Sequence, residues 1–230
     1  MTGFVISLKI LYCLLLLEFR RDNKLPIIDI MSEEREAVEL KVIPLDADHE
    51  GDFYKIHCDE NNTGWCYCVA WWTTTWEAWS LSTAEENRIR RENLFKAGQY
   101  DGYLLYVDDK PAGWCQVGPR DRLVNLCDQY KFAPDPDVWA ITCFLLLPKY
   151  REIGLAHYFL KEILKDLSSK KVMYVQGFPR RGHDLSADNV WTGPESVFQK
   201  AGFILERDDP LYPIYGKQLS GEPEEDQDSP

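Results

Sequence analysis

The stretch CFLLLPKYREIGLAHYFLKEILKDL, residues 143–167, joins an apolar run to a short charged loop and then to an amphipathic segment. From residue 156 to 167, apolar side chains recur at intervals of three and four, the spacing of one helical face. The run before Pro148 is apolar at successive positions, as expected of a strand buried on both faces of a sheet. We therefore predict a buried strand over 138–148, a loop, and a helix.

The next segment extends this unit. KVMYVQGFP, residues 171–179, predicts a second strand. Strand, helix and strand should form a right-handed crossover with the two strands parallel. Downstream, PESVFQKAG (194–202) predicts a short helix that ends at Gly202, and FILERD (203–208) predicts a strand.

The first half of the chain predicts a strand at 37–46 and then a helix capped by Asp46 or Asp48. Thr83 and Glu86 have the spacing of a capping box, which predicts a helix over 83–98. Two apolar runs joined by DDKP predict a β-hairpin over 100–123. Residues 64–79 are dense in aromatic and β-branched side chains, so part of them should be strand.

These elements predict a single α/β (α+β) domain over residues 31–219. Its sheet should be mixed and mostly antiparallel, with a central parallel strand-helix-strand crossover and flanking helices. The tail 220–230 is acidic and rich in proline, which predicts disorder.

Residues 1–30 form a hydrophobic extension. FVISLKILYCLLLL, residues 4–17, is shorter than the roughly 20 residues of a membrane span and carries Lys9. It also lacks the basic start and the cleavage site of a signal peptide. We favour a true start at Met31, with membrane contact through residues 4–17 as the alternative.

The composition of the chain indicates which classes of binding partner it suits. The 230-residue chain has a formal net charge of -12, which argues against nucleic acid binding. Such a charge suits a cationic partner such as an amine, or simply keeps the protein soluble. Seven cysteines, mostly inside hydrophobic runs, predict reduced thiols and a cytoplasmic location. HCDENNTGWCYC (57–68) contains no CxxC pair, so we expect no metal.

The loop after the buried strand has the pattern R-x-x-G-x-A, formed by Arg151, Gly154 and Ala156. A helix start presents backbone N–H groups without internal partners and the positive end of the helix dipole, so it attracts anions. Gly154 has no Cβ to obstruct a phosphate, and Arg151 adds a positive charge. The pattern therefore predicts a phosphate site, the alternative being a plain loop in which Gly154 eases the bend.

Three stretches, GWCQVGPR (113–120), ITCFLLLPKYREIGLA (141–156) and WTGPESVFQKAGF (191–203), resemble the GNAT superfamily of acetyl-coenzyme A-dependent N-acetyltransferases. They are most similar to an uncharacterised bacterial-type branch, and the order of elements matches over roughly residues 39–219. The resemblance implies acetyl transfer from acetyl-coenzyme A to a primary amine of an unidentified small molecule or peptide by direct attack. A non-catalytic acyl-coenzyme A-binding module or sensor is the alternative. We expect a monomer or a homodimer.

The resemblance also implies where the coenzyme lies. The strand before the loop should lend its backbone to the pantetheine arm, the loop amides should hold the pyrophosphate, and the acetyl thioester should lie where the two parallel strands splay apart. The expected cofactor-binding residues are Phe144, Leu145, Leu146, Arg151, Glu152, Ile153, Gly154, Leu155, Ala156 and His157.

The chain departs from the family at the catalytic positions. Many members carry on the last helix a tyrosine that gives a proton to the thiolate, where this chain has Phe198. A glutamate used by some members is replaced by Ala140 or Ile141. The catalytic residues therefore remain unassigned. The candidates for proton transfer are His183, Asp184 and Asp188, which are otherwise solvated loop residues.

Tryptophans are the candidate substrate contacts, because an aromatic ring can hold an ammonium group by cation–π attraction. The alternative is that these side chains fill the core. We expect Trp72 and Trp114 to contact the substrate; the wider set considered is Trp71, Trp72, Trp114, Trp139 and Trp191.

Overall fold

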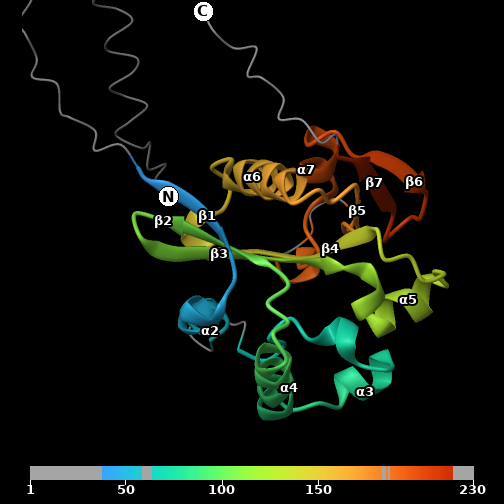
Figure 1. Cartoon of the computed structure of the whole chain (residues 1–230), viewed down its shortest axis with the longest axis horizontal. Helices are drawn as coiled ribbons and strands as arrows, with labels where there is room; N and C mark the ends of the chain where they lie inside the picture. The colour runs from blue at the N-terminus through green and yellow to red at the C-terminus, as the bar shows by residue number, and fades with distance from the viewer. Residues whose placement is uncertain (1–37, 59–63, 183–184, 186, 220–230) are drawn as a thin grey trace, which may run out of the picture. The chain divides into compact units, whose positions relative to one another are not determined.

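The structure is a computed structural model that describes residues 38–58, 64–182, 185 and 187–219. Within these residues, seven strands form one sheet in the order β1-β2-β3-β4-β5-β7-β6 (Figure 1). The strands are β1 (Leu40–Pro44), β2 (Tyr103–Val107), β3 (Lys110–Pro119), β4 (Val138–Leu146), β5 (Tyr174–Gly177), β6 (Ile204–Arg207) and β7 (Ile214–Gln218). Among the strands of the described residues, only β4 and β5 pair in parallel, so the predicted fold class is confirmed.

Helices cover both faces of the sheet (Figure 1). One face carries α6 (Leu155–Ser169) and α7 (Glu195–Lys200). The other carries α2 (Glu50–Ile56), α3 (Trp76–Ser80), α4 (Ala84–Lys96) and α5 (Val124–Tyr130). Short 3-10 turns complete the chain at η2 (Ala47–His49), η4 (Ala70–Trp72), η5 (Arg120–Arg122), η6 (Pro148–Tyr150) and η7 (Ala187–Val190).

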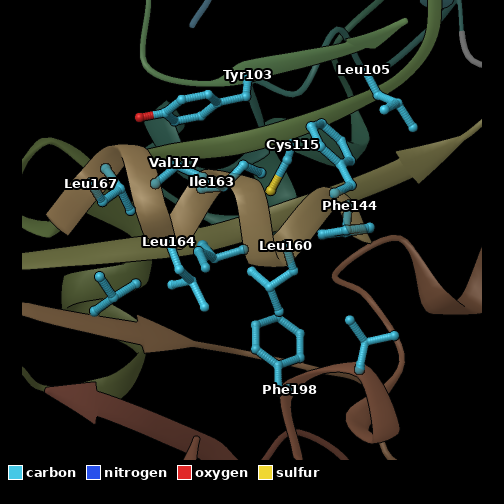
Figure 2. Close-up of a cluster of buried hydrophobic side chains, with 14 of the residues drawn as sticks. Tyr103, Leu105, Cys115, Val117, Phe144, Leu160, Ile163, Leu164, Leu167 and Phe198 are labelled. Atoms are coloured by element: carbon cyan, nitrogen blue, oxygen red, sulfur yellow. The ribbon is translucent and has the colours of Figure 1, made fainter. Parts of the chain in front are cut away.

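The predicted stripe on α6 faces the sheet and packs into a buried hydrophobic cluster (Figure 2). Burial of each such side chain stabilises the fold by roughly 1.5–3 kcal/mol. Val117 and Phe144 pack against this helix from the sheet, and Phe198 closes the cluster from α7. The buried α6 residues are Leu155, Phe159, Leu160, Ile163, Leu164 and Leu167.

Several local predictions are confirmed. Asp46 accepts hydrogen bonds from the amides of Asp48 and His49 in η2, and α2 follows it. The capping box of Thr83 and Glu86 begins α4. Asp108 and Asp109 both have positive φ at the hairpin turn between β2 and β3.

The strand predicted within residues 64–79 is wrong. These residues form turns, η4 and the start of α3. The side chain of Arg91 on α4 is fully buried and donates hydrogen bonds to the carbonyls of Tyr67 and Cys68, which holds the backbone in a turn. Tertiary hydrogen bonds thus override the local preference for strand. Neither β7 nor α5 was predicted from the sequence.

A bulge in β4 changes which face its side chains occupy. Gln116 pairs with Cys143 and Val117 with Ile141, so Thr142 is an extra residue in β4. In a regular strand, Ile141 and Cys143 would share a face, because alternate residues of a strand point the same way. Instead Ile141 packs on the α6 side and Cys143 on the α2 side. The pairing of β4 with β5 also ends at Ile141 and Gly177, so the two strands separate at this bulge.

Candidate active site

The loop from β4 to α6 leaves the N-terminus of α6 without a side-chain cap. Gly154 is the N-cap residue of α6, with φ of 88°, and no side chain caps the helix. Glu152 also has a positive φ of 64°. The first turn of α6 contains no acidic residue, so the positive end of the helix dipole stays uncompensated within it. A Cβ at Gly154 would meet no atom within 4 Å, so glycine serves the backbone conformation rather than packing.

Arg151 holds this loop to the strand. Its Nε donates a 2.7 Å hydrogen bond to the carbonyl of Leu146, the last residue of β4. The side chain thus places its positive charge at the rim of the cavity that the loop borders.

This cavity, which we call the loop cavity, has a volume of about 630 Å³. It extends from the start of α6 along the end of β4 and reaches the turn that precedes η4. Seven of the ten expected cofactor-binding residues line it: Phe144, Leu145, Leu146, Arg151, Glu152, Gly154 and Ala156. Its other lining residues are His57, Trp65, Cys66, Cys68, Trp79, Cys143, Leu185, Val190, Trp191 and Pro194.

The remaining three expected residues lie outside the cavity lining. Leu155 points into the core, and Ile153 is exposed. His157 is half-buried, and its Nδ1 has no hydrogen-bond partner among the described residues.

A second cavity, which we call the tryptophan cavity, has a volume of about 620 Å³. Trp71 and Trp76 meet edge to face in its wall, with ring centres 5.0 Å apart, and Trp71 lies 5.7 Å from Trp191. Trp79 and Trp191 line both cavities, so the two lie next to each other. The lining residues are Trp71, Thr74, Thr75, Trp76, Trp79, Asn125, Asp128, Gln129, Tyr130, Phe178, Trp191, Thr192 and Tyr212.

The expected substrate contacts Trp72 and Trp114 line neither cavity. Trp114 is fully buried and packs on Phe53, with ring centres 4.9 Å apart. Trp72 is half-buried beneath the guanidinium of Arg91, which lies 5.1 Å from its ring centre. Both tryptophans therefore have a packing role in this structure.

The gap between β4 and β5 is bridged by backbone. The amide of Phe144 donates a 2.8 Å hydrogen bond to the carbonyl of Trp191. Trp71 donates from its indole Nε1 to the carbonyl of Thr142 at 3.3 Å. The hydroxyl groups of Thr142 and Thr192 are buried, and within the described part of the chain neither has a hydrogen-bond partner. Buried polar atoms thus lie on residues next to the place where the strands separate.

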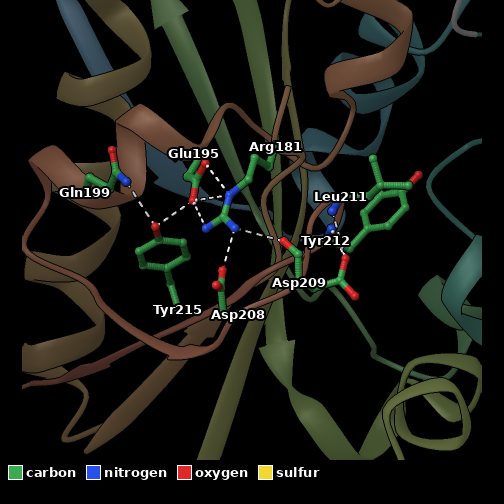
Figure 3. A network of polar contacts seen from close by, with 8 residues as sticks. All are labelled: Arg181, Glu195, Gln199, Asp208, Asp209, Leu211, Tyr212 and Tyr215. Carbon is green, nitrogen blue, oxygen red and sulfur yellow. Dashed lines mark hydrogen bonds and ion pairs between the residues drawn. The ribbon is translucent and has the colours of Figure 1, made fainter. Parts of the chain in front are cut away.

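A polar network holds the segment between β5 and α7 (Figure 3). Arg181 forms hydrogen bonds with both carboxylate oxygens of Glu195, the shortest at 2.6 Å, and one with Asp208 at 2.5 Å. These carboxylates raise the pKa of Arg181, and the Arg181 guanidinium holds the pKa of Glu195 below its usual value. Tyr215 donates to Glu195 at 2.6 Å, which joins α7 to β7.

The candidates for proton transfer stay predictions. His183 and Asp184 lie outside the described residues. Asp188 lies in η7, and its side chain is not described.

Comparison with known proteins identifies the family of the chain. A family model described as the acetyltransferase (GNAT) family matches residues 47–180, more than half of the chain. The chain therefore belongs to the GNAT acetyltransferase family, whose enzymes use acetyl-coenzyme A. A search of curated proteins found no relative.

Solved structures with a similar fold include three acetyltransferases. A PaiA N-acetyltransferase from Thermoplasma acidophilum, solved in complex with coenzyme A, is 14% identical with a TM-score of 0.49, over 78% of this chain and 99% of that chain. A putative GNAT acetyltransferase from Desulfovibrio desulfuricans is 15% identical with a TM-score of 0.47, over 80% and 100%. The ribosomal-protein-S18-alanine N-acetyltransferase from Escherichia coli is 13% identical with a TM-score of 0.46, over 81% and 97%.

Two further findings concern the described residues alone. Among them, no group of three or more histidine, cysteine, aspartate or glutamate side chains is arranged to hold a metal ion. None of the helices they form has the length and apolar character needed to cross a membrane.

Sequence reasoning missed part of the cavity wall. His57, Cys66, Cys68 and Cys143 line the loop cavity, although the position of these cysteines in hydrophobic runs had indicated packing. Cys143 lies 75 positions beyond Cys68, and the bulge at Thr142 directs it toward the α2 side. No residue type in β4 marks that bulge, so the sequence carried no signal for it.

Proposed function

We propose that the loop cavity binds acetyl-coenzyme A and that the tryptophan cavity binds the acceptor, a primary amine of a small molecule or peptide. The observation that carries this proposal is the arrangement of the two cavities. One begins at an uncapped helix N-terminus, the other has aromatic walls, and they share Trp79 and Trp191. A thioester and an amine could therefore meet at the shared wall.

The loop supplies the anion-binding part of this proposal. Backbone amides from Glu152 to His157 would hold the pyrophosphate at the start of α6, with Arg151 adding a charge at the rim. The pantetheine arm would follow Leu146, Leu145 and Phe144 toward the gap between β4 and β5.

Acetyl transfer would proceed by direct attack of the amine on the thioester carbonyl. An amine of this kind has an unperturbed pKa of about 10.4, so it must lose a proton before it attacks. The oxyanion that forms needs a donor, and the amide of Phe144 is our candidate. That amide donates to the carbonyl of Trp191 here, so the acetyl oxygen would have to replace that carbonyl.

The tryptophan cavity suits a cationic acceptor. Trp71, Trp76 and Trp191 present ring surfaces, and Asp128 contributes a carboxylate to the wall. This carboxylate is largely exposed and pairs with Lys131 at 2.8 Å, so the aromatic rings rather than Asp128 would supply most of the attraction.

The cellular setting we propose is the cytoplasm, as a monomer or a homodimer. Free thiols at Cys66, Cys68, Cys115, Cys127 and Cys143 support a reducing compartment.

A thiol-release assay tests the proposed function. Purified protein is given acetyl-coenzyme A and a panel of polyamines, amino acids, aminoglycosides and peptides, and free coenzyme A is measured. We expect thiol release with at least one amine. Tight binding of acetyl-coenzyme A without thiol release on any amine would instead favour the non-catalytic sensor.

Two variants locate the acceptor site. Trp76→Leu removes a partly exposed ring from the tryptophan cavity, so the KM for the amine should rise about ten-fold while the KM for acetyl-coenzyme A stays unchanged. Trp139→Leu is the control, because Trp139 packs on the α6 side and lines neither cavity. Equal effects of the two variants on the KM for the amine would show that the acceptor does not bind in the tryptophan cavity.

A further inference from the structure

Two cysteine sulfurs are in contact in the wall of the loop cavity. The Sγ atoms of Cys68, in the turn before η4, and Cys143, on β4, are 2.8 Å apart. This separation is shorter than that of two sulfur atoms in ordinary packing. Both residues are largely buried, yet both line the cavity, so a small reagent inside it can reach them.

His57 is placed to take a proton from Cys68. Its Nδ1 lies 3.0 Å from the carbonyl of Phe53, and its ring stacks on the Phe53 ring. Because a carbonyl only accepts, Nδ1 carries the proton in this contact, which leaves Nε2 as the acceptor. Nε2 lies 3.4 Å from the Sγ of Cys68. A base held by a third group beside a thiol is the arrangement that activates nucleophilic cysteines.

Arg91 adds a buried positive charge beside the pair. It donates hydrogen bonds to the carbonyls of Tyr67 at 3.0 Å and Cys68 at 2.7 Å, and its guanidinium is fully buried. These bonds fix the turn, in which Tyr67 and Cys68 both have positive φ.

The surroundings make the two thiols unequal. Burial raises the pKa of Cys68, but its hydrogen bond with Cys143 and the charges of His57 and Arg91 outweigh it and hold that pKa well below its usual value. The hydrogen bond to Cys68, together with burial, raises the pKa of Cys143. Burial also raises the pKa of Cys66, to about 12. Cys68 therefore loses its proton more readily than Cys143 does, as in redox-active cysteine pairs.

We propose that Cys68 and Cys143 form a redox-active pair that a peroxide converts to a disulfide. This inference goes beyond acetyl transfer and does not depend on it. It rests on the contact between the two sulfurs, the oriented imidazole and the opening of both thiols to the cavity.

The reaction takes place in two steps. The Cys68 thiolate attacks one oxygen of hydrogen peroxide, the O–O bond breaks, and the leaving hydroxide takes the proton held by His57 to give water. Cys68 is then a sulfenic acid. The sulfur of Cys143 attacks that sulfur, the S–O bond breaks, and the departing hydroxide takes the Cys143 proton to give a second water. Two thiols lose two electrons, and one peroxide gains them.

Mass spectrometry of the reduced full chain tests the proposal. The protein is treated with one equivalent of hydrogen peroxide, alkylated and digested. We expect a peptide pair cross-linked through Cys68 and Cys143, while Cys66 and Cys127 are recovered alkylated. Cys66→Ser is the matched control, because Cys66 lines the same cavity, and it should keep the cross-link. Recovery of Cys68 and Cys143 as alkylated thiols, or a link between Cys68 and Cys66, would overturn the proposal.

A second experiment separates the roles of the two sulfurs. In Cys143→Ser the reaction should stop at the sulfenic acid of Cys68, which a dimedone-type reagent labels, whereas Cys68→Ser should leave Cys143 unlabelled. In the wild-type chain at pH 7, Cys68 should react with iodoacetamide at least about ten-fold faster than Cys127, whose pKa burial raises. If a variant fails to fold, the cross-link and the alkylation rates of the wild-type chain still test the proposal. Labelling of Cys143 in Cys68→Ser, or equal alkylation rates, would contradict the assignment.

Discussion

Gly154 combines a conformational role and a proposed binding role in one residue. Its φ of 88° lies in the left-handed region, which asparagine and aspartate tolerate better than other side chains do. This tolerance allows a matched pair of variants that differ mainly in charge. Gly154→Asn changes the shape of the loop, and Gly154→Asp adds a negative charge to a similar shape.

We expect Gly154→Asp to weaken acetyl-coenzyme A binding by roughly ten- to a hundred-fold, because the carboxylate repels the phosphates at the helix start. Gly154→Asn should keep most of the affinity, and both variants should lose about 1 kcal/mol of stability. Calorimetric titration and thermal melting measure the two effects. Equal affinity in the two variants would mean that no phosphate binds at this loop.

Phe198 illustrates how a family position can change its role. Its ring is fully buried and lines neither cavity. A Cβ added to Gly177 would come within 2.3 Å of this ring, and one added to Gly193 within 3.1 Å, so the two glycines make room for it. The Phe198 ring therefore fills the space between the C-terminal end of β5 and the segment before α7.

We expect Phe198→Ala to cost about 3–5 kcal/mol of unfolding free energy, because it leaves a cavity in the core. Phe198→Tyr should cost about 1–3 kcal/mol, because it buries a hydroxyl group. Denaturant titration gives both values. An unchanged free energy of unfolding in Phe198→Tyr would show that the new hydroxyl has a hydrogen-bond partner or reaches a cavity. That is the situation expected for the tyrosine that many family members carry at this position.

At the scale of elements, periodicity was enough to predict the units with a strong repeat. The stripe on α6 and the capping box of α4 are local signals, and both elements were predicted. The turn at 64–68 depends instead on Arg91, about 25 residues away, and β7 depends on its pairing with β5 and β6. Contacts of this range leave no local pattern in a single sequence.

The candidate site also contains one part that is local in sequence and another that depends on distant contacts. The loop from Arg151 to Ala156 is contiguous in sequence, and four of its six residues line the loop cavity. The tryptophan cavity and the pair of Cys68 and Cys143 bring together distant segments. Trp72 and Trp114 line neither cavity, and their contact with substrate stays a prediction, because from the sequence an aromatic residue fits packing and cavity lining equally well.

Arg181 fixes the segment that reaches the shared wall of the two cavities. Arg181→Gln removes the bidentate contact with Glu195 and should loosen the segment. The hydrogen-exchange protection of the amides of residues 180 and 181 should then fall by about ten-fold. Those amides donate to Gly193 and Leu211 respectively. Arg122→Gln is the control, because Arg122 pairs with Asp101 instead. Equal protection in both variants would show that Arg181 does not hold the segment.

At the scale of the whole molecule, we propose that residues 31–219 are the acetyltransferase domain, with extensions at 1–30 and 220–230. Deletion of residues 1–30 should leave a protein that melts within about 2 °C of the full chain, because the described core is built from residues after 38. Its affinity for acetyl-coenzyme A should also be unchanged. Aggregation of the shortened protein would place the 4–17 segment in the core or in an interface.

The central claim is that coenzyme A lies in the loop cavity, and a crystal structure of the full chain with coenzyme A tests it most directly. We expect the pyrophosphate within hydrogen-bond distance of the amides from Glu152 to His157, and the pantetheine arm along Leu146 to Phe144. The sulfur should end near the gap where β4 leaves β5. Coenzyme A bound in the tryptophan cavity, or anywhere away from the start of α6, would contradict the account.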